Sequence, residues 1–368
     1  MQHEGTAHPI VGKLASTQTR RGFLRASAFA TMSAPFLLTS RGAAAAGKLF
    51  YASYGGSNGE ALDKIFFKPF SRETGIEVVQ TPPVQLAKLR AAAAAGSIEW
   101  DIIEWQPAEI QAAASLGLLQ PLDYSVIRAD DIVFPASRKK FWYSKSFYTT
   151  GIGYGARTFE AGKHPTNWRE FWDAKRFPGR RGLLSIPQDT LEIAVLAAGI
   201  APENVYPIDV ELAFATLKEI KPHIRKWTDT PPETIALIQN GELDFDYTYN
   251  GRVFAAAQAG SKVGFSKSQL MIFFSPSCVP TGAKNPRDAM RLLNYMMDSN
   301  RQAEYGRTMG FFPMSRRGLE LASDELKDWI PDFRDPQNLL MADATLDWWG
   351  APGRLEQLTE RFKEFLFS

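Results

Sequence analysis

The stretch from Lys48 to Val79 limits the fold more than any other, because it is typical of a strand, a glycine loop, a helix and a second strand. The loop is Tyr54-Gly55-Gly56, where glycine adopts backbone angles that other residues resist. Ser57 and Glu60 fit a capping box, so we expect a helix to begin near Asn58. Such a βαβ unit predicts a parallel sheet with the loop at its carboxyl edge, where open α/β folds bind ligands.

The rest of the chain continues this alternation of strand and helix signals, which predicts α/β layers. Its 368 residues are enough for two domains. We interpret two long β-type segments, Phe147–Gly155 and Met271–Pro280, as crossings between two lobes, and glycines would let the first one bend. Each lobe is then expected to be a mixed sheet flanked by helices, with lobe 1 formed by residues 47–152 and 277–321 and lobe 2 by residues 153–276 and 322–368.

Residues 1–46 have the parts of an export signal. Thr19–Arg25 matches a twin-arginine motif, Ala26–Leu38 is an apolar region, and Ala43–Ala46 fits an A-x-A-type cleavage site. The apolar region is too short, and too rich in Ala, Ser and Thr, to span a bilayer. The alternative is a basic tail ahead of a chance apolar run. Because the parts come in the right order before the first strand, we expect the twin-arginine translocase to export the chain to the periplasm, with cleavage near Ala46.

Charge and cysteine content narrow the function further. Residues 1–46 hold five basic residues and one acidic residue, so the net charge of +2 becomes −2 without them. A nearly neutral chain gives no electrostatic reason to expect nucleic acid as a partner. Cys278 is the single cysteine, so no intrachain disulfide is possible. Because no cysteine lies near the cleavage site, we expect no lipid anchor.

Six segments of the chain match the sequence pattern of one protein family. These segments are Tyr51-Ala-Ser-Tyr-Gly-Gly56, Phe67-Lys-Pro-Phe70, Glu73-Thr-Gly-Ile-Glu-Val78, Gly117-Leu-Leu-Gln-Pro-Leu-Asp123, Gly241-Glu-Leu-Asp-Phe-Asp-Tyr-Thr-Tyr-Asn-Gly-Arg252 and Gly310-Phe-Phe-Pro313. They resemble ABC-transporter solute-binding proteins, with the spermidine/putrescine receptors as the nearest branch. The resemblance covers essentially all of residues 48–368. It implies a two-lobe periplasmic-binding-protein clamp of type II-like form, with a small-molecule ligand in the cleft between the lobes. It also implies a membrane permease as partner, and we expect a monomer.

Catalysis has little support in the sequence. His164 and His223, the histidines after the leader, lie in neither H-E-x-x-H nor any paired metal spacing. Ser137-Arg-Lys-Lys140 matches S-x-x-K but lacks the companion motifs of that enzyme class. Cys278 as a nucleophile would need a partner base, and none is implied. We therefore expect no enzyme activity, no metal and no cofactor.

Binding has more support, because aromatic residues fall at several expected strand-to-loop edges. An aromatic face holds an apolar stem, or a cation at about 0.5–2 kcal/mol. Core packing is the alternative for each ring, and their shared place at the sheet edge favours binding. For Trp348 and Trp349, helix packing is favoured. The ligand-site residues predicted on these edges are Tyr54, Gly55, Trp105, Gln106, Tyr249, Phe273, Ser275 and Phe311.

The acidic candidates are Asp189, Glu192 and Asp229. In the polyamine receptors that the chain resembles, an Asp-x-x-Glu pair at the start of a second-lobe helix holds the amines, and here that pair is Asp189 and Glu192. The alternative for Asp189 is a helix cap. The family's tryptophan before Asn-Gly is replaced by Tyr249.

A larger departure from the polyamine receptors lies in the second crossing. Those receptors carry Trp-x-Asp there, whereas this chain has Phe273-Phe274-Ser275. Because buried charges require partners, the missing carboxylate disfavours a ligand with several positive charges. It favours a mono-amine, a γ-amino acid or a less charged solute. Arg252 would meet a ligand carboxylate bidentately, and the alternative for Arg252 is a salt bridge within its lobe.

The sequence leaves other functions open. Related clamps bind ferric ion through tyrosines, but we expect Tyr247 and Tyr249 to face opposite sides of their strand, which argues against paired ligation. A thiamine-type receptor of the same fold, a periplasmic hydrolase, and a receptor that signals to a membrane partner are the remaining alternatives.

Overall fold

The structure is a computed structural model that describes residues 47–157, 159 and 163–368. The export signal predicted for residues 1–46 lies outside these residues. The described residues form one compact unit. Within the described part, no helix has the length and apolar character that a membrane span requires.

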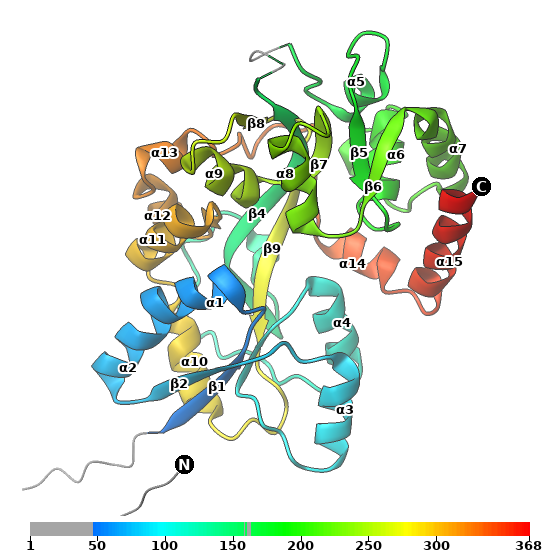
Figure 1. Cartoon of the computed structure of the whole chain (residues 1–368). Coiled ribbons are helices and arrows are strands. Elements are labelled where there is room, and N and C mark those ends of the chain that lie inside the picture. The colour runs from blue at the N-terminus through cyan, green and yellow to red at the C-terminus, as the bar shows by residue number, and fades with distance from the viewer. Residues whose placement is uncertain (1–46, 158, 160–162) are drawn as a thin grey trace, which may run out of the picture. The chain divides into compact units, whose positions relative to one another are not determined.

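Eleven strands form one mixed sheet (Figure 1). The strands are β1 (Lys48–Ala52), β2 (Glu77–Thr81), β3 (Ile102–Glu104), β4 (Trp142–Gly155), β5 (Arg181–Leu184), β6 (Ile224–Thr228), β7 (Phe245–Tyr249), β8 (Val263–Phe265), β9 (Met271–Cys278), β10 (Phe312–Pro313) and β11 (Leu339–Leu340). Their order is β2-β1-β3-β9-β4-β7-β5-β6, with β8 and β10 also paired to β4 and β11 to β9. We expected a separate sheet in each lobe, whereas the structure joins both halves through β9 and β4.

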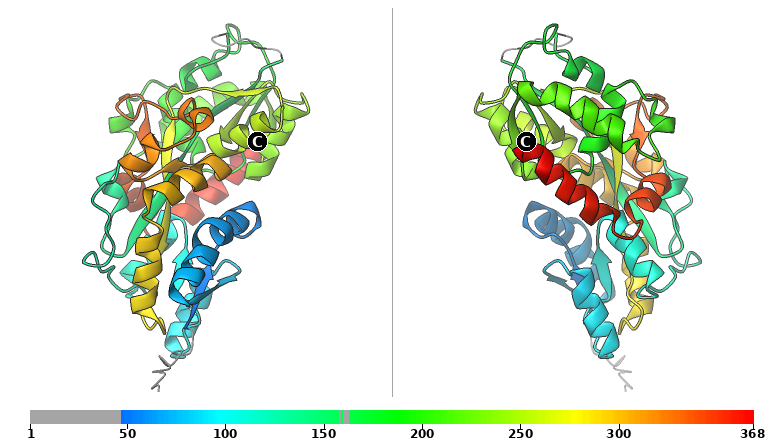
Figure 2. Two further views of the ribbon diagram at one scale, coloured as in Figure 1. Left: turned by 90° about the vertical axis from the view of Figure 1, so that its left-hand side faces the viewer. Right: turned by 90° about the vertical axis from the view of Figure 1, so that its right-hand side faces the viewer.

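Helices flank both ends of this sheet. They are α1 (Gly56–Leu62), α2 (Lys68–Thr74), α3 (Leu86–Ala94), α4 (Pro107–Ser115), α5 (Trp168–Trp172), α6 (Thr190–Ala197), α7 (Val210–Ile220), α8 (Pro231–Gln239), α9 (Asn250–Gln258), α10 (Pro286–Tyr295), α11 (Ser299–Met309), α12 (Arg316–Glu320), α13 (Asp324–Lys327), α14 (Asp343–Trp349) and α15 (Arg354–Phe367). A π-helical turn (Asp63–Phe67) links α1 to α2, and 3-10 turns span Pro135–Ser137, Pro202–Asn204 and Lys221–His223. Figure 2 shows α15 alongside α7, where Arg361 donates two hydrogen bonds to Glu211.

The βαβ unit predicted at the start has the expected parallel pairing, with Lys48 opposite Glu77 and Ala52 opposite Thr81. Gly75 ends α2 at a φ of 76°, in the left-handed conformation expected of a helix C-cap. The predicted capping box was wrong. Gly55 is the N-cap at a φ of 70° and makes no side-chain cap bond, so Ser57 lies inside the first turn.

The two crossings are the adjacent antiparallel strands β4 and β9. The first part of β4 pairs with the end of β9, Trp142 opposite Cys278, and its last part pairs with β7, Thr150 opposite Tyr249. Regular pairing continues through Gly153, and the irregular register lies between Ser144 and Phe147 instead. The bend expected at the glycines therefore stays a prediction. A Cβ on Gly153 would lie 2.5 Å from Thr248 Cγ2, so this glycine is needed for close packing.

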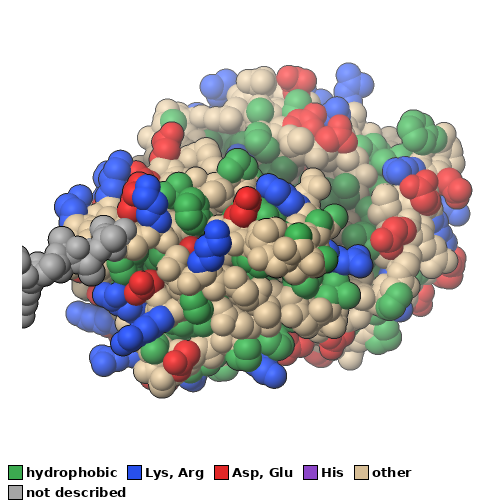
Figure 3. All heavy atoms as spheres, turned by 90° about the horizontal axis from the view of Figure 1, so that it is seen from below, with side chains coloured by type: hydrophobic (Ala, Val, Ile, Leu, Met, Phe, Trp, Pro, Cys, Tyr) green, Lys and Arg blue, Asp and Glu red, His purple; other side chains and the backbone are tan. Residues whose placement is uncertain are grey.

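Two large hydrophobic cores confirm the two-lobe α/β class. The first surrounds β1, β3 and α10, and the second surrounds β5, α6, α7 and α15. A smaller cluster packs α8 and α9 against β8. Ile272 and Leu346, which we expected in lobe 2, pack in the first core. The exact lobe boundaries therefore stay a prediction. Seen from below, acidic and basic side chains are interspersed over the end of the molecule that carries β1 and β2 (Figure 3).

Candidate functional site

Three aromatic rings gather around Tyr148, which lies in the middle of β4. Phe273 stacks on Tyr148 with ring centroids 5.3 Å apart, and Phe311 stacks at 5.4 Å. Tyr249 lies 6.1 Å from Tyr148. Strand register explains the gathering, because Tyr148 is directly opposite Phe273 on β9 and Thr150 is opposite Tyr249 on β7. We define Tyr148, Tyr249, Phe273 and Phe311 as the aromatic cluster.

Tyr249, Phe273 and Phe311 were predicted site residues, whereas Tyr148 was not predicted. We had treated Phe147–Gly155 only as a crossing between lobes. A crossing strand must pass the point where the two halves meet, so its central side chains were candidates from the sequence alone. The structure brings the three predicted rings together around the one that was overlooked.

The glycine loop and the start of α4 approach the same cluster. The Gln106 side chain interacts with the hydroxyls of both Tyr54 and Tyr148. Gln106 also caps α4 in a capping box with Glu109, which fixes its backbone. Gly55 precedes α1 and has open space around its Cα. Trp105 lies behind this edge, because its ring is buried in the first core and its indole N–H donates to the carbonyl of Val84.

Asp189 precedes α6 and does not cap it, since its side chain makes no hydrogen bond to the helix N-terminus. Its carboxylate instead accepts a hydrogen bond of 2.6 Å from the hydroxyl of Tyr247. Its φ of 65° is strained for a non-glycine residue, and such strain is typical of ligand sites. Burial raises the pKa of Asp189 to about 6, although the bond from Tyr247 lowers it. The chain therefore tolerates an unfavourable backbone to hold this carboxyl group in place.

Glu192 lies one turn further along α6 and is fully buried. Its Oε1 accepts hydrogen bonds from Trp349 Nε1 at 2.6 Å and from the Tyr206 hydroxyl at 2.7 Å. Its Oε2 has no partner. Burial, followed by the charge of Asp189, raises the pKa of Glu192 to about 7. Two neighbouring carboxyl groups thus lie at the start of one helix, and one oxygen atom is free to accept a hydrogen bond.

The expected orientation of two tyrosines was wrong. We had placed Tyr247 and Tyr249 on opposite sides of β7, but residues two apart on a strand share a face. Their rings accordingly contact each other, with centroids 5.5 Å apart. The side that carries Asp189, reached by Tyr247, is therefore continuous with the aromatic cluster, reached by Tyr249.

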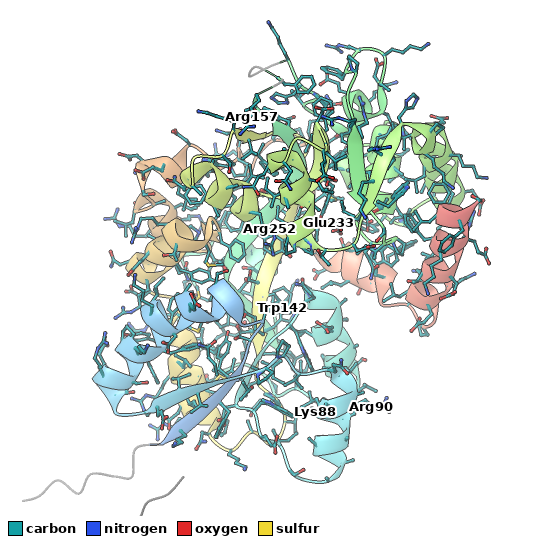
Figure 4. All side chains as sticks on the ribbon, viewed as in Figure 1. Lys88, Arg90, Trp142, Arg157, Glu233 and Arg252 are labelled. Carbon is teal, nitrogen blue, oxygen red and sulfur yellow. The ribbon has the colours of Figure 1, made fainter. Side chains whose placement is uncertain are left out.

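The remaining predicted site residues lie around this centre. Arg252 is exposed in the first turn of α9, and its charge acts on the Tyr249 hydroxyl. Figure 4 shows Arg252 near β9 in the middle of the molecule. Asp229 is exposed after β6 and accepts a hydrogen bond from Ser185. Ser275, on β9, donates its backbone N–H to Ser144 Oγ at 2.9 Å. Ser275 shares a face of β9 with Phe273, because the two residues are two apart on the strand, and the roles of Asp229 and Ser275 stay predictions.

The groups considered for catalysis have structural partners. Ser137 Oγ is buried and donates to the carbonyl of Phe134 at 2.7 Å. Burial raises the pKa of the Cys278 thiol, which disfavours a nucleophilic thiolate. Among the described residues, no group of three or more His, Cys, Asp and Glu side chains is arranged to hold a metal ion.

A surface hollow of about 490 Å³ lies away from the candidate site. Its lining includes Lys88, Trp100 and Lys284, and it shares no residue with the predicted site. Figure 4 shows Lys88 on α3, at the other end of the described structure from Arg157. The candidate site is therefore defined by side-chain contacts and not by this hollow.

Comparisons with known proteins give the family of the chain. Residues 66–330 match the family model of bacterial extracellular solute-binding proteins. The chain is 27% identical to a gamma-aminobutyric acid-binding protein of Pseudomonas aeruginosa, covering 84% of this chain and 88% of the relative. It is 22% identical to a spermidine/putrescine-binding periplasmic protein of Salmonella typhimurium, covering 80% and 86%.

Among solved structures, an ABC transporter substrate-binding protein from Bradyrhizobium japonicum has a TM-score of 0.78 at 30% identity. The match covers 87% of this chain and 99% of that one. Both the family model and this structural match extend over most of the chain. The chain therefore belongs to the bacterial extracellular solute-binding proteins, a family whose members capture solutes.

Proposed function

We propose that the captured solute is a short ω-amino acid, with γ-aminobutyrate as the reference compound. The observation that carries this proposal is that two groups of opposite charge lie close enough to Tyr249 to act on it. Asp189 and Arg252 both act electrostatically on the Tyr249 hydroxyl. An acidic group and a basic group beside one aromatic cluster suit a ligand with an ammonium group at one end and a carboxylate at the other.

The second crossing supports the same choice over a polyamine. A diamine or triamine has a second ammonium group that needs its own acidic partner in a buried site. On β9, Phe273 and Ser275 occupy the place where the resemblance led us to expect a tryptophan and an aspartate. We infer that the apolar stem of the ligand packs on the aromatic cluster, its ammonium group meets Asp189 and Glu192, and its carboxylate meets Arg252.

Calorimetry of the mature protein with γ-aminobutyrate and putrescine tests this arrangement. We expect γ-aminobutyrate to bind more tightly and to raise the melting temperature, since a ligand of the native state stabilises it. Arg252→Met is expected to weaken γ-aminobutyrate binding about tenfold, as loss of one charged contact does, and to leave putrescine binding unchanged or stronger. Asp189→Asn is expected to weaken both. Arg90→Met, on the exposed face of α3, is the control that changes neither.

Two results would contradict the proposal. One is equal loss of both ligands in Arg252→Met, which would place no ligand carboxylate at Arg252. The other is the absence of binding and of thermal stabilisation across ω-amino acids, polyamines, amino acids, sugars and thiamine.

A ferric-ion receptor is the second candidate, because the shared face of Tyr247 and Tyr249 removes the objection made from the sequence. Burial raises the pKa of Tyr247, which opposes the phenolate that iron requires. A visible charge-transfer band on adding ferric citrate, lost in Tyr249→Phe, would favour iron over an amino acid.

We also propose the cellular setting that the sequence predicts. The chain leaves the cytoplasm through the twin-arginine route, is cleaved near Ala46, and works in the periplasm as a monomer that delivers its ligand to a membrane permease without catalysis. The lobes divide near residues 152 and 276, and they close on the ligand by hinge motion. N-terminal sequencing of the periplasmic protein tests the export proposal, and we expect its first residue to be Gly47.

A further inference from the structure

The C-terminal segment reaches the candidate site from the far end of the chain. β11 pairs in parallel with β9, where Leu339 is opposite Met271, and α14 follows directly. At the start of α14, Asp343 accepts a hydrogen bond of 2.6 Å from Lys139, and Leu346 packs in the first core. At its end, Trp349 packs in the second core. The position of Trp349 is therefore fixed by contacts with both halves of the sheet.

The side chain of Trp349 forms a hydrogen bond with one atom of the candidate site, Glu192 Oε1. Its indole N–H donates to Glu192 Oε1 across 157 positions of sequence, and the Tyr206 hydroxyl donates to the same atom. Glu192 Oε2 is buried and has no partner. The two oxygens of the Glu192 carboxyl group thus differ in their hydrogen bonding. Oε1 accepts two hydrogen bonds, whereas Oε2 is a buried acceptor that lowers stability unless a donor reaches it.

We propose that Trp349 and Tyr206 are positioning residues for ligand capture: they hold Glu192 Oε1 and leave Oε2 to accept the ammonium group of the ligand. This inference rests on the proposed function of the site. It changes the interpretation of Trp349, for which helix packing was favoured from the sequence. Its neighbour Trp348 has the packing role instead, with its ring 6.2 Å from that of Tyr206, whereas the donors to Glu192 are Tyr206 and Trp349.

The two donors also favour the charged form of Glu192. Hydrogen bonds to a carboxylate favour its ionised form, and those from Trp349 and Tyr206 lower the pKa of Glu192 against the effects of burial and of Asp189. The titratable groups that face Glu192 are Asp189 at the start of its own helix and Tyr206 after it. Tyr247 and Tyr249 of β7 act on Asp189. A pKa of about 7 means that losing either donor moves Glu192 toward its neutral form under ordinary conditions.

The test compares Trp349→Phe and Tyr206→Phe, which remove one donor each and keep the ring, with Trp348→Phe as the matched control. Protein labelled with ¹³C at the glutamate carboxyl carbon reports the titration of Glu192 by NMR, and the signal is assigned by its loss in Glu192→Gln. Calorimetry with γ-aminobutyrate from pH 6 to pH 9 reports binding.

We expect the Glu192 titration midpoint to rise in Trp349→Phe and Tyr206→Phe and to stay constant in Trp348→Phe. A rise of about one pH unit leaves roughly one-fifth of the wild-type carboxylate at pH 7, so affinity falls about fivefold there and recovers at pH 9. A variant that lowers only the melting temperature, with the midpoint and the pH profile of binding unchanged, would overturn the positioning role. Absence of amine binding by the wild-type protein would instead overturn the proposed function, and the NMR midpoints distinguish the two failures.

Discussion

Replacing Lys145 by methionine is expected to lower the free energy of unfolding by about 3–5 kcal/mol, because it leaves a buried carboxylate without its partner. Lys145 Nζ lies 2.5 Å from Glu104 Oε1, and the two side chains are 1% and 4% exposed. Glu104 Oε2 accepts a hydrogen bond from Asn58, which in turn accepts one from Tyr305. The ammonium group also lies 5.5 Å from the ring centroid of Tyr305.

Urea unfolding of three variants measures this effect. Lys145→Met with Glu104→Gln is expected to recover part of the loss, since the double variant buries no unpaired charge and the amide still bonds Asn58. The control is Lys48→Met, which breaks the exposed pair of Lys48 and Glu77 and is expected to cost less than about 1 kcal/mol. A loss in Lys145→Met no larger than that of Lys48→Met would show that the buried pair adds little stability. Because Asn58 belongs to α1, the buried pair also supports the glycine loop that carries Tyr54.

The second large effect is a pH dependence of stability caused by Asp246. This residue of β7 is fully buried, and neither of its carboxyl oxygens has a partner. Burial, with a smaller effect from the charge of Glu233, raises its pKa well above the usual value. The folded protein therefore holds a proton that the unfolded chain releases above about pH 4. Stability contributed by the neutral form is complete below that pH, and it falls by about 1.4 kcal/mol per pH unit up to the folded pKa.

Asp246→Asn removes this titration, so the variant is expected to gain stability over the wild type as the pH rises above about 4 toward the folded pKa of Asp246. Urea unfolding at each pH measures the difference. The control is Asp244→Asn on the same segment. Burial raises the pKa of Asp244, but hydrogen bonds from Arg180 outweigh it and hold the pKa below its usual value. That carboxylate stabilises the fold above the unfolded pKa, so its replacement lowers stability at neutral pH. Parallel curves for wild type and Asp246→Asn would mean that Asp246 does not carry the buried proton.

Local signals in the sequence explain where several elements begin and end. Gly75 is the C-cap of α2, and Pro107 is the first residue of α4. These signals work because capping, the missing proline N–H and the conformational freedom of glycine act within one helical turn. The capping box at Ser57 failed because Gly55 already provided the N-cap.

The sequence also predicted several residues of the candidate site. Segments that resemble solute-binding proteins predicted the fold class and the residues Asp189, Glu192, Tyr249 and Phe311. A strand period of two would have put Tyr247 and Tyr249 on one face. The sequence therefore contained the information needed to place both tyrosine rings on one face of β7.

The sequence by itself determined the alternation of strands and helices, the family and a set of polar and aromatic candidates, because these depend on local patterns. Only the tertiary structure decided which candidates meet. Tyr148 becomes the centre of the aromatic cluster through the register of β4 with β9, and Trp349 reaches Glu192 across 157 residues. Lys145 finds Glu104 in the same way, across 41 residues. Such contacts follow from strand register and core packing, which depend on the whole chain at once.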